Sequence, residues 1–182
     1  MSQYYNVPMI KKVTDYLEKL NIPYRLLRHE AVITTEQSRQ VIHVDNCTSC
    51  KSLFVKDKKS DNYYLVVLSF DKRADMRVLA SLVGCAKFEF ATEEVLWQKL
   101  NVHRGSVSPF AFLNERGNDI PLIVDYDVWN GNNVKFHPCD NTATVVISTA
   151  DFRKFVASLN KRVVVTHPSD KTKKLTPSDK NT

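Results

Sequence analysis

Residues 50–70 read CKSLFVKDKKSDNYYLVVLSF, in which two apolar runs flank a polar hexapeptide. The runs Lys51–Lys56 and Tyr63–Phe70 are rich in Phe, Val, Leu and Tyr, residue types that favour strands. The polar residues 57–62 between them are typical of a turn. We therefore predict a β-hairpin over this stretch.

The segments on either side of the hairpin show helical and strand patterns. Apolar residues at steps of three and four predict helices, whereas short β-branched and aromatic runs bounded by turn residues predict strands. The predicted helices are 9–20, about 35–41, 74–83, 92–100 and one beginning at 148 or 149, and the predicted strands are 24–27, 87–90, 110–113, 120–125, 134–137, 142–148 and 162–165. Several strands follow one another through short turns. We therefore predict an α+β fold with a mixed, largely antiparallel sheet that curls toward a barrel, with helices outside.

Length and composition bound the class of protein. Of the 182 residues, 43% are hydrophobic and 25% are charged, which is typical of globular domains and unlike disordered or fibrous chains. We expect residues 1–166 to form a single domain and residues 167–182, a polar lysine-bearing segment, to be a disordered tail. Lysine and arginine outnumber aspartate and glutamate by 26 to 20, which favours an anionic partner such as nucleic acid without establishing one.

The cysteines and the N-terminal residues bear on compartment and cofactors. The N-terminal residues lack a basic segment followed by an apolar stretch, and no apolar run reaches membrane-helix length, so we expect a cytoplasmic protein with no membrane partner. Cys47 and Cys50 form a C-x-x-C pair, but a zinc site would need a second such pair. Cys85, His137 and Cys139 could complete a scattered site, although free thiols are favoured, and we expect no metal and no cofactor.

The segment Gly105–Pro109, with the sequence GSVSP, is a candidate functional loop. It differs from the G-x-S-x-G elbow of hydrolases, because Pro replaces the second Gly and a strand is predicted to follow, so Ser108 is not predicted to be a nucleophile. Gly105 can adopt a positive φ and expose backbone N–H groups that bind an oxyanion or phosphate. Taken alone, the local sequence favours a plain connector between helix and strand.

Lys51 and His137 are the candidate side chains. Lys51 begins an otherwise apolar strand, where an ammonium group can hold a phosphate. His137 ends a predicted strand ahead of a proline-containing turn, and the residues alone fit either a structural histidine or a ligand-orienting donor. His29 and His103 present weaker cases of the same ambiguity, and Thr34 is first of all a candidate helix cap.

Six blocks of residues occur in an order that resembles the YbaK/ProX family, the free-standing relatives of the editing domain inserted in bacterial prolyl-tRNA synthetase. The blocks are His29–Thr34, Cys50–Asp57, Phe90–Glu94, Gly105–Phe110, Phe136–Pro138 with Asn141–Thr142, and Ser148–Phe152. The resemblance covers about residues 7–165 and is greatest to the ProX branch. Each block is weak alone, but the ordered set is specific.

The resemblance implies a deacylase that hydrolyses the ester of mischarged tRNA(Pro), chiefly Ala-tRNA(Pro). It implies that Lys51 engages the terminal nucleotide region, that the Gly105 loop contacts the acyl ester through its backbone, and that His137 lines the amino-acid pocket. The implied catalytic residues are Lys51, Gly105 and His137, and the implied substrate-binding residues are Thr34, Ser106, Val107, Ser108 and Pro109. The implied partners are tRNA and, as a further candidate, prolyl-tRNA synthetase.

An aminoacyl ester needs little catalytic machinery. The ester lies beside a ribose 2′-OH and is already activated, so hydrolysis requires a positioned water, donors for the developing oxyanion and a fixed substrate. A lysine, a histidine and a backbone loop without a nucleophile or metal centre match that requirement. Three alternatives stay open: removal of another amino acid such as cysteine from the same tRNA, a non-catalytic tRNA-binding module, and a zinc-binding interaction protein that uses Cys47 and Cys50.

Overall fold

The computed structural model describes residues 7–31, 43–114 and 120–167. The described strands are β1 (Arg25–Arg28), β2 (Cys47–Asp57), β3 (Tyr63–Ser69), β4 (Phe88–Phe90), β5 (Leu122–Asp125), β6 (Asn133–Phe136), β7 (Ala143–Ser148) and β8 (Val163–Thr166). The described helices are α1 (Val7–Lys19), α3 (Met76–Leu82), α4 (Glu93–Leu100), α5 (Tyr126–Asn130), α6 (Thr149–Ser158) and the 3-10 helix η1 (Pro109–Asn114). The predicted helix over about 35–41 and the tail beyond His167 lie outside these ranges.

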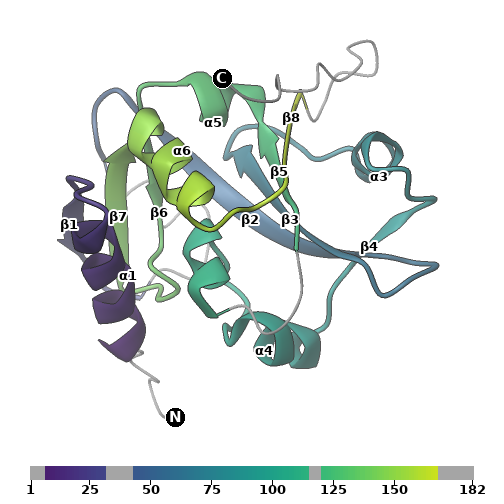
Figure 1. The fold of residues 1–182 in the computed structure, drawn as a ribbon, viewed down its shortest axis with the longest axis horizontal. Coiled ribbons are helices and arrows are strands. Elements are labelled where there is room, and N and C mark those ends of the chain that lie inside the picture. Colours follow the sequence, from purple (N-terminus) through teal and green to yellow (C-terminus); the bar gives the residue numbers. More distant parts are fainter. Residues whose placement is uncertain (1–6, 32–42, 115–119, 168–182) are drawn as a thin grey trace.

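The long strand β2 joins two halves of one curled sheet (Figure 1). The strand order is β1-β7-β6-β2-β3-β5-β8, and β4 also pairs with β2. Residues 47–49 of β2 pair in parallel with β6, residues 50–56 pair antiparallel with β3, and residues 55–57 pair antiparallel with β4. Among the described strands the path ends at β1 and β8, which do not pair with each other, and β4 pairs with β2 alone, so the sheet curls without closing. The prediction of an α+β fold with a mixed, curled sheet is confirmed.

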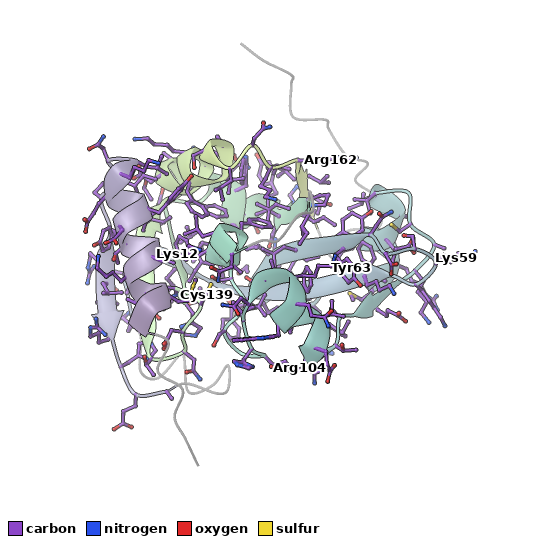
Figure 2. The ribbon with its side chains drawn as sticks, turned by 60° about the horizontal axis from the view of Figure 1, so that its bottom comes forward. Lys12, Lys59, Tyr63, Arg104, Cys139 and Arg162 are labelled. Carbon is purple, nitrogen blue, oxygen red and sulfur yellow. The ribbon has the colours of Figure 1, made fainter. Side chains whose placement is uncertain are left out.

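The predicted hairpin is confirmed as β2 and β3. Its register pairs Lys51 with Leu68 and Lys56 with Tyr63, and the turn between the strands projects from the body of the molecule, with Lys59 at its tip (Figure 2). Antiparallel pairs predominate in this part of β2, whereas β3–β5 and β5–β8 are parallel. The hairpin therefore connects an antiparallel region to a parallel one.

The main core lies between the sheet and α1, η1, α5 and α6. Phe110 is fully buried at its centre, and its ring packs edge-on against Phe136 at 6.1 Å and Phe155 at 5.1 Å between centroids. A second, smaller core lies under α3 on another part of the sheet and contains Val55, Leu68 and Leu79. Figure 1 shows α1 and α6 beside β1, β6 and β7, and α3 apart from them.

Two elements differ from prediction. The predicted strand 110–113 is wrong, because these residues form η1, whose consecutive residues Phe110, Ala111 and Phe112 are all buried. A short apolar run has no periodicity that separates a strand from a buried helix. The helix α5 was not predicted, because its five residues are too few for a periodic pattern and only the Asp125 cap marks its start.

No helix within the described ranges combines the length and the apolar character that crossing a membrane would require.

We expect Phe110→Ala to lower the free energy of unfolding by about 3–5 kcal/mol, because it removes an aromatic side chain from the packed core. Urea denaturation measures this change. Phe90→Ala is the matched control, since Phe90 is an exposed phenylalanine on β4 and should cost within about 0.5 kcal/mol. Equal losses in the two variants would contradict the assignment of η1 to the core.

Candidate functional site

The parallel register of β2 and β6 brings Lys51 and His137 to one face of the sheet. The last pair of this ladder is Ser49 with Lys135; Lys51 lies two residues further along β2, and His137 lies two residues beyond Lys135, directly after β6 ends at Phe136. Residues two apart on a strand project from the same face. Cys50 and Phe136, one residue earlier in each case, face the main core. Lys51 and His137 therefore project together from the opposite face.

The ammonium group of Lys51 is held at the end of β3. Its Nζ donates a hydrogen bond to the carbonyl oxygen of Phe70 at 3.1 Å and lies 5.9 Å from the centroid of the Phe70 ring. The side chain is half-buried. A half-buried lysine fixed at one end presents its charge at a defined position, which suits recognition of a phosphate.

The imidazole of His137 has a defined tautomer. Its Nδ1 donates to the carbonyl oxygen of Ala143 at 2.8 Å, so the proton of the neutral ring is on Nδ1 and Nε2 is the acceptor. Burial lowers the pKa of His137, and the neighbouring His29 lowers it further, although the bond to Ala143 acts in the opposite direction. The ring is therefore neutral at pH 7.

Thr144 links His137 to His29. The Thr144 hydroxyl oxygen lies 3.5 Å from His137 Nδ1 and 3.0 Å from His29 Nε2, and the two rings are 5.8 Å apart between centroids. His29 Nδ1 in turn lies 2.8 Å from the carbonyl oxygen of Glu30. The sequence analysis missed Thr144, which is a buried hydroxyl in the apolar strand β7. A lone polar residue inside an apolar strand is the signal that could have indicated it.

The Gly105–Pro109 loop presents its first residues to solvent and buries its last. Gly105 is exposed at a φ of +83°, a conformation that side-chain-bearing residues rarely adopt, whereas Ser108 and Pro109 are buried. The N–H of Ser106 donates to the carbonyl oxygen of His103 at 3.1 Å. Among the described residues, none accepts a hydrogen bond from the N–H groups of Gly105 and Val107.

Ser108 ties this loop to the turn that follows His137. Its Oγ lies 3.7 Å from Cys139 Sγ and accepts a hydrogen bond from the Phe110 N–H at 3.3 Å. Burial raises the pKa of the Cys139 thiol to about 12, so the sulfur stays protonated and is not a nucleophile. Figure 2 shows Cys139 in the interior. Cys139 lies in the main core two residues after His137, so this contact ties the buried end of the loop to the segment that follows β6.

Glu93 holds the other end of the loop. Its carboxylate accepts from His103 Nδ1 at 2.8 Å and from the Arg104 backbone N–H at 3.3 Å, and the Arg104 guanidinium lies 3.5 Å away. Glu93 also lies in the first turn of α4. Its second role depends on a contact ten residues away along the chain, which local spacing does not reveal.

The remaining predicted features are not brought together in this region. Thr34 lies outside the described residues. Cys47 and Cys50 are free thiols whose pKa values are raised by burial, and neither belongs to a metal-binding cluster within the described ranges. The one such cluster there is Asp125, Asp127 and His167, and Lys72 already forms ion pairs with both of its carboxylates, at 2.7 and 2.6 Å. Lys72 thus supplies the positive charge that a cation would otherwise provide.

A hollow of about 830 Å³ is present elsewhere on the described surface. It surrounds the N-terminal end of α3, and its lining includes Arg73 and Arg77. None of the predicted site residues lines it. We therefore do not assign the candidate site to this hollow.

A comparison with protein-family models matches residues 29–155 to the aminoacyl-tRNA editing domain. The chain belongs to this family. It is 36% identical to the prolyl-tRNA editing protein ProX of Acetoanaerobium sticklandii over 141 residues, which cover 77% of the chain and 85% of the relative. It is 31% identical to the prolyl-tRNA synthetase associated domain-containing protein 1 of Xenopus laevis over 162 residues, covering 86% and 95%.

The fold comparison agrees with the family. A crystal structure described as a candidate trans-editing enzyme for prolyl-tRNA synthetase superposes with a TM-score of 0.66 at 20% identity, covering 86% of this chain and 94% of that one. The predicted family is thus confirmed, and so is the expectation of an editing enzyme whose substrate is an aminoacyl-tRNA. The individual residue roles stay predictions.

We expect Glu93→Ala to loosen the start of the Gly105 loop, because His103 and Arg104 lose their shared acceptor. The backbone amide of Arg104 should exchange with deuterium faster, while the free energy of unfolding falls by less than about 1 kcal/mol, as is usual for partly exposed ion pairs. Glu94→Ala is the matched control, since it removes an acidic residue from the same turn that attracts Arg104 electrostatically but hydrogen-bonds Thr92 rather than the loop. If the Arg104 amide exchanges faster in both variants, the cause is the loss of an acidic residue from the first turn of α4 and not the loss of the Glu93 contacts to the loop.

The lowered pKa of His137 predicts a pH dependence of stability. The unfolded chain binds this proton more tightly than the folded protein, so the free energy of unfolding falls as pH decreases below about 6.5. His137→Gln should show a shallower decrease between pH 7 and pH 5 in urea denaturation. His43→Gln, which removes an exposed histidine, serves as the control. If the free energy of unfolding falls equally with pH in the wild type and in His137→Gln, His137 does not cause the pH dependence.

Proposed function

We propose that this protein hydrolyses the ester of mischarged tRNA(Pro), chiefly Ala-tRNA(Pro), in trans. The observation that carries the proposal is the β2–β6 register, from which we infer that Lys51 and His137 project from one face of the sheet; we place the Gly105 loop beside them as part of the proposal. The parallel register supports the pairing of Lys51 with His137, and the contact between Ser108 and Cys139 supports the proximity of the loop. Both the family and the ProX relative agree with this activity.

In this proposal Lys51 binds the 3′-terminal nucleotide region of the tRNA. Its ammonium group is already oriented by the Phe70 carbonyl, so little side-chain entropy is lost when an anionic group binds. A phosphate placed there would fix the terminal ribose. Fixing the ribose positions the ester against the Gly105 loop, and positioning is the main requirement for hydrolysis of an activated ester.

The Gly105 loop supplies donors for the developing oxyanion. The N–H groups of Gly105 and Val107 donate to no residue in the described part of the chain, and Gly105 is exposed. Backbone donors held before the substrate arrives stabilise charge in the transition state without reorganisation. The positive φ at Gly105 is what turns the backbone into this arrangement.

His137 acts on the amino-acid end of the substrate. Its Nδ1 proton is committed to Ala143, so the unprotonated Nε2 can accept a hydrogen bond from the α-ammonium group of the amino acid. A neutral ring also avoids repulsion with that positive group. Selection against proline is steric, whereas alanine is separated from glycine or serine by only about 1–3 kcal/mol, so we expect some promiscuity.

Recognition of the tRNA body draws on the basic surplus of the chain. The net charge of +6 should make affinity fall as the salt concentration rises. Association with prolyl-tRNA synthetase is a further part of the proposal. It is supported by the name of the Xenopus laevis relative, which describes a synthetase-associated domain.

The test compares release of amino acid from tRNA(Pro) charged with alanine, cysteine or proline. We expect rapid hydrolysis of the alanine ester, slower hydrolysis of the cysteine ester and none of the proline ester. Lys51→Ala should lower kcat/KM by at least about a hundredfold without loss of fold, as removal of a transition-state or anchoring contact does. Lys56→Ala is the matched control, because Lys56 lies on the same strand and pairs with the exposed Asp61.

One outcome would overturn the proposed activity, and a second would overturn the role of Lys51. Protection of all three esters by the wild-type protein would indicate a binding module rather than an enzyme. Full activity of Lys51→Ala, or equal losses in Lys51→Ala and Lys56→Ala, would remove Lys51 from the site while leaving the activity in place.

A further inference from the structure

Trp97 is an exposed tryptophan stacked on an exposed histidine. The Trp97 side chain on α4 is 47% exposed, which is unusual for so large an apolar group. Its ring stacks on the ring of His103 with 4.8 Å between centroids and 25° between planes. His103 is itself exposed. The two rings form an exposed aromatic stack with its outer ring faces free of each other, which we call the Trp97 platform.

A hydrogen bond from His103 to Glu93 holds the Trp97 platform in place. Glu93, one helical turn before Trp97, binds His103 Nδ1 at 2.8 Å and so fixes the imidazole beside the indole. The same carboxylate accepts from the Arg104 backbone N–H. A surface whose rings are already oriented loses less conformational entropy when a planar ligand stacks on it.

The Trp97 platform is continuous with the Gly105 loop. His103 and Arg104 directly precede Gly105, and the Ser106 N–H donates back to the His103 carbonyl oxygen. The Arg104 side chain is 71% exposed and lies at the periphery near α4 (Figure 2). An aromatic surface beside an exposed positive charge combines stacking with attraction for a phosphate, as single-stranded nucleic-acid sites do.

We propose that the Trp97 platform stacks an unpaired nucleobase of the single-stranded C-C-A 3′ end of tRNA. The proposal rests on the proposed function, which puts the terminal acylated ribose at the Gly105 loop. Bases just before that ribose must pass near residues adjoining the loop. Arg104 then pairs with a phosphate of the same strand.

A second aromatic pair provides a contrast. Tyr126 is also 47% exposed and stacks on His167 at 4.7 Å and 29°. Its neighbours Asp125 and Asp127 are acidic, and Figure 1 shows α5 at the opposite end of the molecule from α4. This pair has the geometry of a stack but lies away from the Gly105 loop, and therefore away from the path that we propose for the RNA.

The experiment measures binding of a single-stranded RNA that ends in C-C-A and carries no amino acid. Binding to the full chain is followed by fluorescence anisotropy of the 5′-labelled oligonucleotide. Trp97→Leu should weaken affinity on the order of tenfold, and Trp97→Tyr should restore part of it, because base stacking on an aromatic ring is what is lost. Tyr126→Leu is the matched control and should bind as the wild type does. Arg104→Gln should reduce the slope of log affinity against log salt by about one.

A change in the RNA tests the same contact without altering the protein. Replacing single bases of C-C-A by abasic residues retains every phosphate and removes one stacking surface at a time. The abasic replacement of the base that stacks on Trp97 should lower the affinity of the wild type. The same replacement should not lower the affinity of Trp97→Leu further, since both changes remove the same interaction. Equal affinity of wild type and Trp97→Leu, equal losses in Trp97→Leu and Tyr126→Leu, or additive effects at every abasic position would each overturn the proposal.

The result of this binding experiment is separable from the proposed activity, because the RNA carries no aminoacyl ester. If the protein hydrolyses no aminoacyl ester but shows the expected Trp97 and abasic effects, the proposed role of the Trp97 platform stands and the proposed deacylase function fails. If Trp97→Leu hydrolyses Ala-tRNA(Pro) and binds the RNA as the wild type does, the proposed function stands and the proposed role of the Trp97 platform fails.

Discussion

A three-residue parallel ladder between β2 and β6 is the constraint on which the candidate site depends. Its pairs, from Cys47 with Asn133 to Ser49 with Lys135, set the register of two segments that lie more than 80 residues apart. A shift of one residue would turn the side chain of Lys51 toward the core and bury an unpaired ammonium group. The register is protected because the alternate positions, Cys50 and Phe136, pack in the main core. Burial of apolar side chains on one face thus determines which polar side chains meet on the other.

The chemistry of His137 follows from how the sheet satisfies its polar groups. A buried imidazole must have hydrogen-bond partners, and here the Ala143 carbonyl fixes one nitrogen while Thr144 lies between it and His29. Both imidazoles contact backbone carbonyls through Nδ1. The sheet therefore determines tautomer and orientation together, and the histidine has a defined acceptor at Nε2 without an acidic residue to orient it. A carboxylate partner would raise the pKa of His137 and favour a charged ring, which would repel the ammonium group of an aminoacyl ester.

Much of the fold could be predicted from the sequence because its signals are local. The hairpin, the Thr92 and Ser148 helix caps and the left-handed Gly84 depend on residues within a few positions of one another. The strand predicted at 110–113 failed because four apolar residues fit a buried 3-10 helix equally well. Lys51, Gly105 and His137 were candidates from their local sequence, but their predicted roles came from the order of motifs, which carries information on family and not on contacts. Glu93 and Thr144 were missed because their importance lies in partners that only the folded chain brings near.

The two ends of the Gly105 loop are fixed by different means, and this explains how so short a segment can be preorganised. Glu93 holds the start through His103 and Arg104, at the exposed surface of the molecule. Ser108 holds the end through Cys139 and the first turn of η1, inside the core. Only Gly105, Ser106 and Val107 lie between these anchors, and the Ser106 N–H is already bound. The remaining freedom is confined to two peptide groups, so a glycine at positive φ is enough to define where their N–H groups point. A loop with this construction can stabilise negative charge without a dedicated side chain, since its donors belong to the backbone and their position is maintained by residues outside the loop.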